Sequence, residues 1–319
     1  MRPSYLYRVY RDHLSDYQED KASKKWHPAS IITKVDTSTG GILEKKPLYV
    51  FKPENLGEKM CIDDKQIAKD GFTILSNAKT GKMAMMLETR TKAQVKAALA
   101  LFSKFLWKVK EVSCDMSSGY INACQEAIPF VRIVIDKFHV MQYVYNAVSD
   151  VKNRIKKELS DKLSKGKERT KEDKRLLEDI TLLQHVRHLL WKSPEDWNSE
   201  GAALMQQIFE KFPTLWTAYN LAQILKQWYD KSNCGKTKKE LQRGLNEWYR
   251  QVDQSKIQEF ASTRKMIEKH EENIMNYFVS AHTNAKAECL NGKLQRFFSN
   301  AYGWRDKDFA LFRTAIYFS

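Results

Sequence analysis

The spacing of apolar residues along this chain changes at Asp136, and this change limits the folds that are open to it. Before Asp136, short apolar runs typical of strands alternate with segments whose apolar residues recur at helical spacing. After it, the helical spacing continues and strand signals are absent. All strands must therefore come from the first part of the chain, where they can form one sheet with helices on its faces. The pattern predicts an α/β core followed by a large helical region.

Three short apolar runs begin the strand-forming part, and they are Met60–Asp63, Phe72–Leu75 and Met83–Leu87. Turn-forming residues at Asn77–Gly81 separate the second run from the third. Connections this short join antiparallel strands, because parallel strands need a much longer crossover. The sequence therefore predicts an antiparallel meander of three strands.

The next four elements alternate between helix and strand. We expect a helix over Thr91–Trp107, a strand over Val109–Cys114, a helix through Tyr120–Cys124 and a buried strand over Val131–Ile135. Three antiparallel strands followed by helix, strand, helix and strand is the element order of an RNase H-like core. The predicted fold class is therefore α/β, with an RNase H-like mixed sheet.

The region after Asp136 is interpreted as a large all-helical insertion in this core. Its first helix covers Val140–Leu159, and the last helical segment, Glu268–Phe298, has a candidate break at Thr283–Asn284. Residues 1–55 are polar and rich in turn signals, which favours a loosely structured lead-in with one or two short elements. We divide the chain into a lead-in or truncated DNA-binding region (1–55), the first part of the core (56–140), the insertion (141–270) and the C-terminal core helices (271–319).

Composition narrows the class of protein. The formal charge is +15, from 54 Lys and Arg against 39 Asp and Glu, which is typical of nucleic-acid-binding proteins; a basic protein with a merely solvated surface is the alternative. The five cysteines are scattered singly, which excludes the close pairs of a structural zinc site or a disulfide framework.

No uncharged stretch approaches the ~20 residues that cross a bilayer, and the first residues contain no apolar core of a signal peptide. We expect a soluble, cytoplasmic protein.

Two aspartates stand where neighbouring strands of the predicted sheet end. Asp63 ends the first strand of the meander, and Asp115 follows the fourth strand. Two adjacent carboxylates repel each other unless a cation lies between them, and oxygen ligands are those that Mg²⁺ prefers. Asp64 is an alternative to Asp63, because successive side chains on a strand point to opposite faces and only one of the two can enter the site.

Glu288 is the candidate for a third carboxylate. In a helix it shares one face with Asn284, Asn291 and Gln295, while the apolar Leu290 lies on another face. The acid would then lie in a polar stripe on a helix whose other side packs against the core. The alternative interpretation is an ordinary solvent-facing glutamate beside lysine residues.

Asp136 and His139 form a second unusual spot, where a buried strand meets a helix. The acid and the imidazole could hold each other by a hydrogen bond and so orient the active-site strands or a DNA phosphate. Equally, Asp136 could cap the following helix while His139 is merely packed.

The sequence resembles transposases of bacterial insertion sequences, of the ISL-three family. The similar segments are Cys-Ile-Asp-Asp (61–64), Val-Ser-Cys-Asp-Met-Ser-Ser-Gly-Tyr (112–120), Ile-Val-Ile-Asp-Lys-Phe-His-Val (133–140) and Thr-Asn-Ala-Lys-Ala-Glu-Cys-Leu-Asn-Gly-Lys-Leu (283–294), with Tyr-Gly-Trp-Arg (302–305) beyond them. The resemblance covers roughly residues 55–315. It implies an RNase H-like core with an all-helical insertion between the last strand and the helix that carries the glutamate.

By this resemblance, Asp63, Asp115 and Glu288 match the catalytic DDE triad, which holds two Mg²⁺ or Mn²⁺ ions. Asp136 and His139 match a supporting acid-x-x-His motif. The implied activity is metal-dependent cleavage and strand transfer of DNA at the ends of an insertion sequence. The implied partners are DNA and further copies of the chain on DNA, in the nucleoid, without a membrane. We further expect Lys293, Arg296 and Arg305 to contact DNA.

One departure from the family separates two functional hypotheses. Full-length members usually begin with a cysteine-rich zinc module and a helix-turn-helix, whereas the first 55 residues here contain neither a cysteine nor a clear helix-turn-helix. The first hypothesis is an active transposase. The second is a truncated, non-catalytic derivative that binds DNA and acts as a regulator. A general RNase H-like nuclease, such as a junction resolvase, would leave the large helical insertion unexplained.

Overall fold

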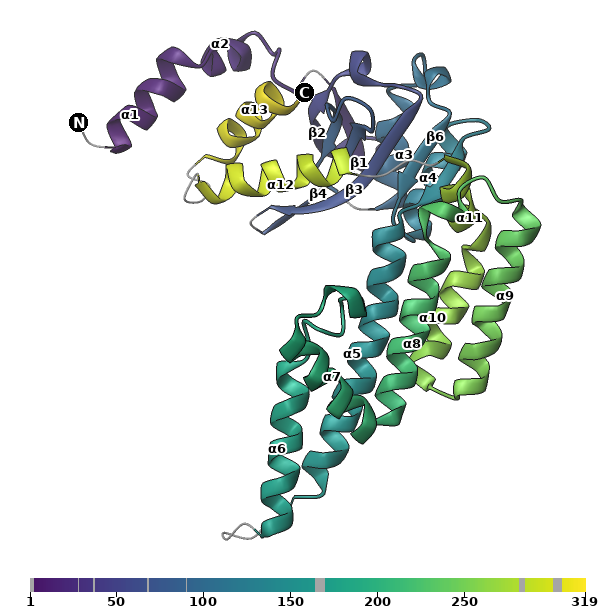
Figure 1. Ribbon diagram of the computed structural model, residues 1–319. Helices are drawn as coiled ribbons and strands as arrows, with labels where there is room; N and C mark the ends of the chain where they lie inside the picture. The colour runs from purple at the N-terminus through teal and green to yellow at the C-terminus, as the bar shows by residue number, and fades with distance from the viewer. Residues whose placement is uncertain are drawn as a thin grey trace. The chain divides into compact units, whose positions relative to one another are not determined.

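The structure, a computed structural model, describes residues 3–27, 29–36, 38–67, 69–89, 91–163, 170–280, 285–300 and 306–319. The chain forms two compact units. The first unit comprises residues 1–136 together with 282–319, and the second comprises 137–281 (Figure 1). The first unit therefore combines both ends of the sequence.

A seven-stranded sheet forms the centre of the first unit, in the order β1-β2-β5-β4-β3-β6-β7. Its strands are β1 (Ser30–Val35), β2 (Ile42–Phe51), β3 (Lys59–Ile67), β4 (Asp70–Asn77), β5 (Met83–Leu87), β6 (Glu111–Cys114) and β7 (Arg132–Ile135). Strands β3, β4 and β5 form the predicted antiparallel meander, and β6 and β7 run parallel to β3. The predicted adjacency of the first meander strand and the fourth strand is confirmed.

Two helices, α3 (Lys92–Ala100) and α4 (Ser118–Ala127), pack against each other, and α4 also contacts β6 and β7. The helix expected over 91–107 ends earlier than predicted, at Ala100. After it, the backbone N–H groups of Leu101 and Phe102 bond to carbonyls three residues back. Bonds of this spacing tighten the chain into 3₁₀-type turns, so apolar spacing alone overestimated the length of the α-helix.

Two helices from the end of the sequence, α12 (Ala285–Asn300) and α13 (Lys307–Phe318), complete the first unit. Leu290 and Leu294 of α12 are buried in a hydrophobic cluster that includes Ile67 of β3 and Phe72 of β4. This packing holds α12 against the middle of the sheet. Helix α13 contacts β2.

The described N-terminal residues form more secondary structure than the one or two short elements expected for a loosely structured lead-in. They form α1 (Pro3–Val9), a π-helical turn (Tyr10–Leu14), α2 (Tyr17–Ala22) and the strands β1 and β2. Tyr17 is buried with its ring centroid 5.1 Å from those of both Phe309 and Phe312 in α13. The partner helix is almost three hundred residues away in sequence, so local turn signals could not indicate this packing.

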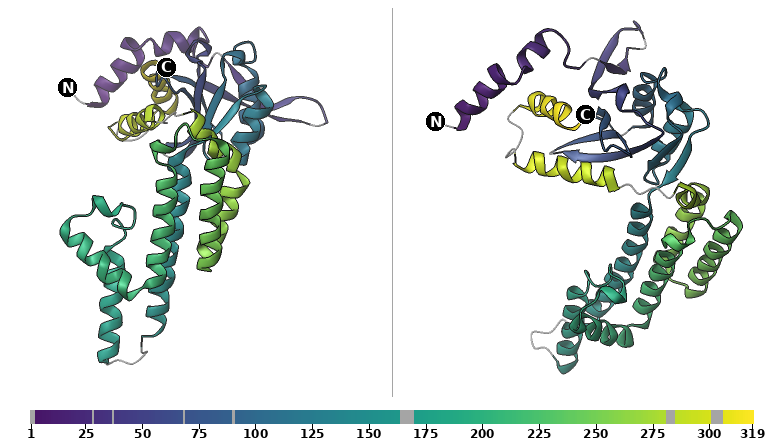
Figure 2. Two further views of the ribbon diagram at one scale, coloured as in Figure 1. Left: turned by 45° about the vertical axis from the view of Figure 1, so that its right-hand side comes forward. Right: turned by 45° about the horizontal axis from the view of Figure 1, so that its top comes forward.

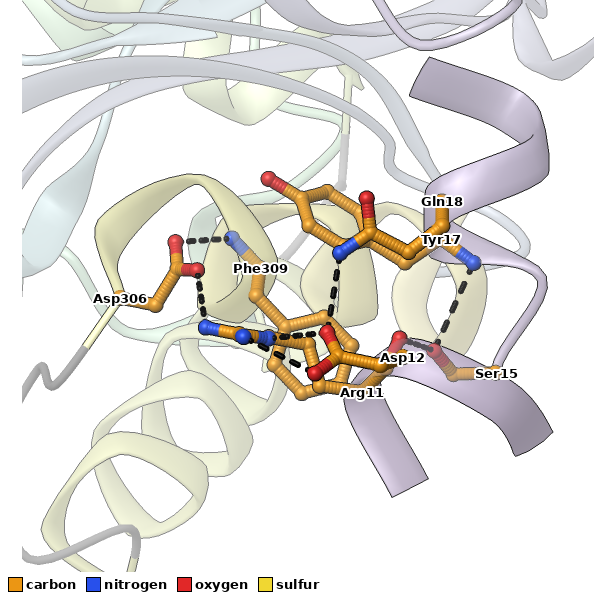
Figure 3. A network of polar contacts seen from close by, with 7 residues as sticks. All are labelled: Arg11, Asp12, Ser15, Tyr17, Gln18, Asp306 and Phe309. Atoms are coloured by element: carbon orange, nitrogen blue, oxygen red, sulfur yellow. Dashed lines mark hydrogen bonds and ion pairs between the residues drawn. The ribbon is translucent and has the colours of Figure 1, made fainter. Parts of the chain in front are cut away.

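An ion-pair network joins the same two regions (Figure 3). The Arg11 guanidinium lies 2.6 Å from a carboxylate oxygen of Asp12 and 3.2 Å from one of Asp306. The other Asp306 oxygen accepts a 3.0 Å hydrogen bond from the backbone N–H of Phe309, at the start of α13. Asp306 therefore caps α13 and ties it to the N-terminal segment.

Among the residues that the structure describes, the second unit contains helices and their connecting loops and no strand (Figure 2). Its helices are α5 (Lys137–Asp161), α6 (Lys171–His185), α7 (Ser199–Lys211), α8 (Pro213–Trp228), α9 (Lys238–Ser255), α10 (Gln258–Lys269) and α11 (Glu271–Ser280). Helix α5 packs against α6, α8 and α10. Across all the described ranges, no helix is long and apolar enough to cross a membrane.

Candidate functional site

Three aspartates lie level with one another across three neighbouring parallel strands, at the point where β6 and β7 end. Strand β3 pairs with β6 so that Cys61 is opposite Ser113, and this register, continued by two residues, sets Asp63 level with Asp115. Strand β6 pairs with β7 so that Cys114 is opposite Ile135, which sets Asp136 level with Asp115. We call this end of the strands the carboxylate edge.

Asp63 lies inside β3 rather than at the end of a strand, which corrects its predicted position. Strand β3 continues to Ile67 because it pairs with β4 along its whole length, from Met60 opposite Asn77 to Ile67 opposite Asp70. Strand β6, however, ends at Cys114. Asp63 therefore lies on the part of β3 that extends past its parallel neighbour.

Each oxygen of the Asp63 carboxylate accepts a hydrogen bond. One oxygen accepts from the Asn291 side-chain amide of α12 at 2.6 Å, and the other accepts from the backbone N–H of Asp64 at 2.8 Å. Asn291 belongs to the polar stripe predicted for this helix. The hydrogen bond fixes the distance between α12 and β3 beside the carboxylate edge.

Glu288 lies three residues before Asn291 and is exposed to solvent. Residues three apart are neighbours on one helix face, so Glu288 lies on the side of α12 that carries Asn291. The buried Cys61 thiol has a pKa raised first by burial and then by the charges of Asp63, Asp136 and Glu288. The three carboxylates therefore lie near enough to this buried cysteine for their charges to act on its thiol.

Asp115 follows β6 directly and is half-buried. One of its carboxylate oxygens accepts a 2.9 Å hydrogen bond from the backbone N–H of Ser117, just before α4 begins. Its charge also contributes to raising the pKa of the Cys114 thiol, for which burial is the main cause. The side chain is thus positioned by the turn between β6 and α4.

Asp64 makes contacts on the opposite face of β3. Its carboxylate accepts a hydrogen bond from the hydroxyl of Tyr120 in α4, and that hydroxyl lies 2.8 Å from the Thr73 hydroxyl. Burial raises the pKa of Tyr120, and the hydrogen bond to Asp64 raises it further. Asp63 therefore points towards α12, whereas Asp64 points towards α4, as side-chain alternation along a strand requires.

Asp136 and His139 lie at the boundary between the two units. Asp136 follows β7, and its backbone N–H donates to the carbonyl of Cys114 at 3.0 Å. Helix α5 begins at the next residue, so Asp136 occupies the position of a helix cap. His139 lies in the first turn of α5, is half-buried, and has its ring 5.8 Å from that of Phe138.

The structure describes two of the three basic residues that were expected to contact DNA. Lys293 and Arg296 are exposed on α12. Arg305, the run 302–305 and the candidate break at 283–284 lie outside the described residues.

Lys293 also lines a cavity of about 260 Å³ together with Lys82 and Lys286. Lys82 follows the turn between β4 and β5, and Lys286 packs beside Gly81 of that turn. The sequence did not predict this cluster of lysines, because its members belong to elements more than two hundred residues apart. These lysines give the cavity a positively charged lining beside α12, the helix that carries Glu288.

The carboxylate edge fits divalent cations by the chemistry of its ligands. Asp63 and Asp115 offer the oxygen ligands that hard cations prefer, and they lie level on neighbouring strands. Within the described ranges, no three His, Cys, Asp or Glu side chains come close enough together to enclose a metal ion. Exposed Glu288 would have to turn towards the two aspartates to complete such a site.

One comparison with known proteins gives a family. A family model described as a transposase, of the ISL-three DDE type, matches residues 60–316. No curated protein and no solved structure has a significant match to the chain. The matched range includes every strand from β3 onward, all of the second unit, and nearly all of the two C-terminal helices.

Proposed function

Since this chain belongs to the ISL-three family of DDE transposases, we propose that it cleaves DNA at the ends of an insertion sequence and joins the freed ends to target DNA. The observation that carries the proposal is the level arrangement of Asp63 and Asp115 on adjacent parallel strands. Helix α12, with Glu288, is held against β3 by the hydrogen bond from Asn291 to Asp63.

The catalytic core that we propose is RNase H-like. The order β5-β4-β3-β6-β7, with an antiparallel meander and two parallel strands added beside its first strand, supports this assignment. The second unit begins directly after β7 and its boundary lies before α12. This placement supports the interpretation of the second unit as a helical insertion before the glutamate-bearing helix.

The proposed metal ligands are Asp63, Asp115 and Glu288. Asp63 is favoured over Asp64 because the Asp64 carboxylate is engaged by Tyr120 on the other face of β3. Divalent ions, two Mg²⁺ or Mn²⁺, would supply activation of water or of a 3′-hydroxyl and would stabilise the departing oxygen. The chain's own task is to hold the acids at fixed spacing, which the β3–β6 register and the amide of Asn291 provide.

Asp136 and His139 are proposed to support the site without binding metal. Asp136 is level with Asp115 and comes directly before α5, so it links the carboxylate edge to the start of the helical unit. The backbone N–H of Asp136 holds the ends of β6 and β7 in register by donating to the carbonyl of Cys114.

DNA is the proposed substrate, and the DNA backbone would pass along α12. Lys82, Lys286 and Lys293 line one cavity, and Arg296 is exposed further along the helix. Ammonium groups gathered at a cavity bind phosphate oxygens and position a strand without reading its sequence. Association of several copies on DNA is part of the same proposal.

The test is a nicking assay on duplex DNA that carries the element's own ends, with Mg²⁺ or Mn²⁺. Asp115→Asn and Glu288→Gln should each lower the nicking rate at least about 100-fold, because loss of even a group that orients a metal ligand commonly costs ~10–100-fold. Glu126→Gln is the matched control, since Glu126 is an exposed acid paired with Lys92 and Lys96.

A protein that binds these ends and divalent metal but never cuts them would contradict the proposal. Such a result would support the regulatory derivative instead. Equal activity of Asp115→Asn and the wild type would show that the nicking comes from a contaminating nuclease or from other residues.

A further inference from the structure

Two exposed aromatic side chains lie at the amino ends of β6 and β7. Trp107 has a relative exposure of 77% and Phe130 one of 104%. Trp107 comes shortly before β6 and Phe130 shortly before β7. The backbone N–H of Arg132 donates to the carbonyl of Lys110 at 2.9 Å, so the two loops that carry these rings lie side by side.

The backbone conformation of Phe130 is unfavourable, and so is the exposure of its phenyl ring to water. Its φ is +61°, in the left-handed region where bulky side chains are rare. Glycine or asparagine would adopt this conformation with less strain. A fully exposed phenyl ring gains no burial within the chain that would offset the strain, and such a residue points to contact with a partner.

The segments that carry the two rings also carry basic side chains. The Lys108 ammonium lies 5.7 Å from the centre of the Trp107 ring. Lys110 pairs with Glu58 at 2.5 Å, and Arg132 lies 3.7 Å from Glu111.

The cations at this end of the strands outnumber the acids. They are Lys59, Lys108, Lys110 and Arg132 against Glu58 and Glu111. Because positive charge is in excess here, the partner is expected to be a polyanion rather than a protein surface with few acidic residues.

We propose that Trp107, Lys108, Lys110, Phe130 and Arg132 form a DNA-contacting surface, named here the aromatic–basic surface. The two rings stack on bases that are unpaired or unstacked, and the cations contact the neighbouring phosphates. Stacking on exposed aromatic rings among basic residues is how many proteins hold single-stranded nucleic acid.

The aromatic–basic surface is separate from the carboxylate edge. Strands β6 and β7 each have four residues, so their two ends are ~13 Å apart at about 3.3 Å per residue. Asp115 and Asp136 follow the carboxyl ends, whereas the rings precede the amino ends. This proposal rests on the proposed function only because it takes DNA as the ligand. It adds a second region of the same chain that binds DNA.

The test is binding of fluorescently labelled single-stranded DNA, followed by anisotropy, without divalent metal. Phe130→Asn should weaken binding about 5- to 150-fold, the range expected for the loss of one stacked base. Asparagine tolerates a positive φ, so this variant should unfold at the same temperature as the wild type or above it. Phe130→Tyr, which keeps the ring, should bind like the wild type, and Trp107→Ala should weaken binding as Phe130→Asn does.

Leu43→Asn is the matched control, because Leu43 is an apolar side chain of 67% exposure on β2, far along the sheet from β7. Unchanged affinity of both Phe130→Asn and Trp107→Ala would overturn the proposal. It would also be overturned if Phe130→Asn changed only the oligomeric mass in sedimentation, because the partner would then be a second copy of the chain. A protein that never nicks DNA but loses affinity in Phe130→Asn would refute the transposase activity and leave this surface standing.

Discussion

At the scale of single residues, Tyr120 connects helix α4, which follows Asp115, to the strand that carries Asp63. Its hydroxyl is buried, donates to Asp64 of β3 and lies 2.8 Å from the Thr73 hydroxyl, while its helix follows directly from the turn after Asp115. The contact opposes any shift of α4 relative to β3. Tyr120 is therefore a positioning residue for the carboxylate edge.

Tyr120→Phe should lower the free energy of unfolding by about 1–3 kcal/mol, because it removes a donor from a partly buried carboxylate. Urea unfolding followed by tryptophan fluorescence measures the change. Tyr5→Phe, at a side chain of 52% exposure, is the control and should unfold like the wild type. An unchanged urea midpoint in Tyr120→Phe would show that Asp64 has other donors of equal value.

The choice between Asp63 and Asp64 shows what residue-level patterns can and cannot predict. Alternation along a strand predicted that only one of the two side chains could face the site. It could not say which face α12 would cover, because that depends on the packing of Leu290 and Leu294 against distant strands. The position of Asp115 was predictable, since the strand expected over Val109–Cys114 ends directly before it.

At the scale of secondary-structure elements, the N-terminal helices and α13 stabilise each other. Tyr17 is central to this contact, since its ring packs against Phe309 and Phe312. Its hydroxyl is buried and has no hydrogen-bond partner among the residues that the structure describes. Burial raises the pKa of this hydroxyl to about 12.

Tyr17→Ala should destabilise the protein by about 3–5 kcal/mol, the usual cost of removing a buried aromatic side chain. Tyr17→Phe should instead be neutral or slightly stabilising, because it removes a polar group that is buried without a partner. Thermal unfolding of the two variants side by side measures both effects. Strong destabilisation by Tyr17→Phe would reveal a partner for the hydroxyl, such as a bound water.

Elements differed in how well the sequence predicted them. Strands β3 to β7 and helix α5 were predictable because each carries its own hydrophobic pattern. The N-terminal helices were not, since their aromatic residues pack mainly against a helix from the other end of the sequence. Strand β2 was also missed, because its first half is exposed and carries a glutamate, two lysines and a proline.

At the scale of the whole molecule, the charge of +15 governs non-specific attraction to DNA. If six to ten phosphates are contacted, DNA affinity should fall about 10³- to 10⁵-fold between 50 and 200 mM salt. Lys286→Gln and Lys293→Gln should each reduce the slope of log affinity against log salt by about one. Anisotropy titrations at several salt concentrations measure this slope.

Lys34→Gln serves as the control for the salt titrations, because Lys34 already lies 3.6 Å from a Glu44 oxygen at the far edge of the sheet. It should leave the slope unchanged. A slope that is insensitive to Lys286 and Lys293 would place the DNA backbone away from the cavity on α12.

The first unit draws its core from both ends of the sequence, and this has a consequence for synthesis on the ribosome. Phe309 and Phe312, which cover Tyr17, are translated after every residue of the helical unit. Asp63 and Asp115 are made early, whereas Glu288 and α13 emerge late. The helical unit can therefore fold first, and the nascent chain lacks Glu288 until α12 has been translated.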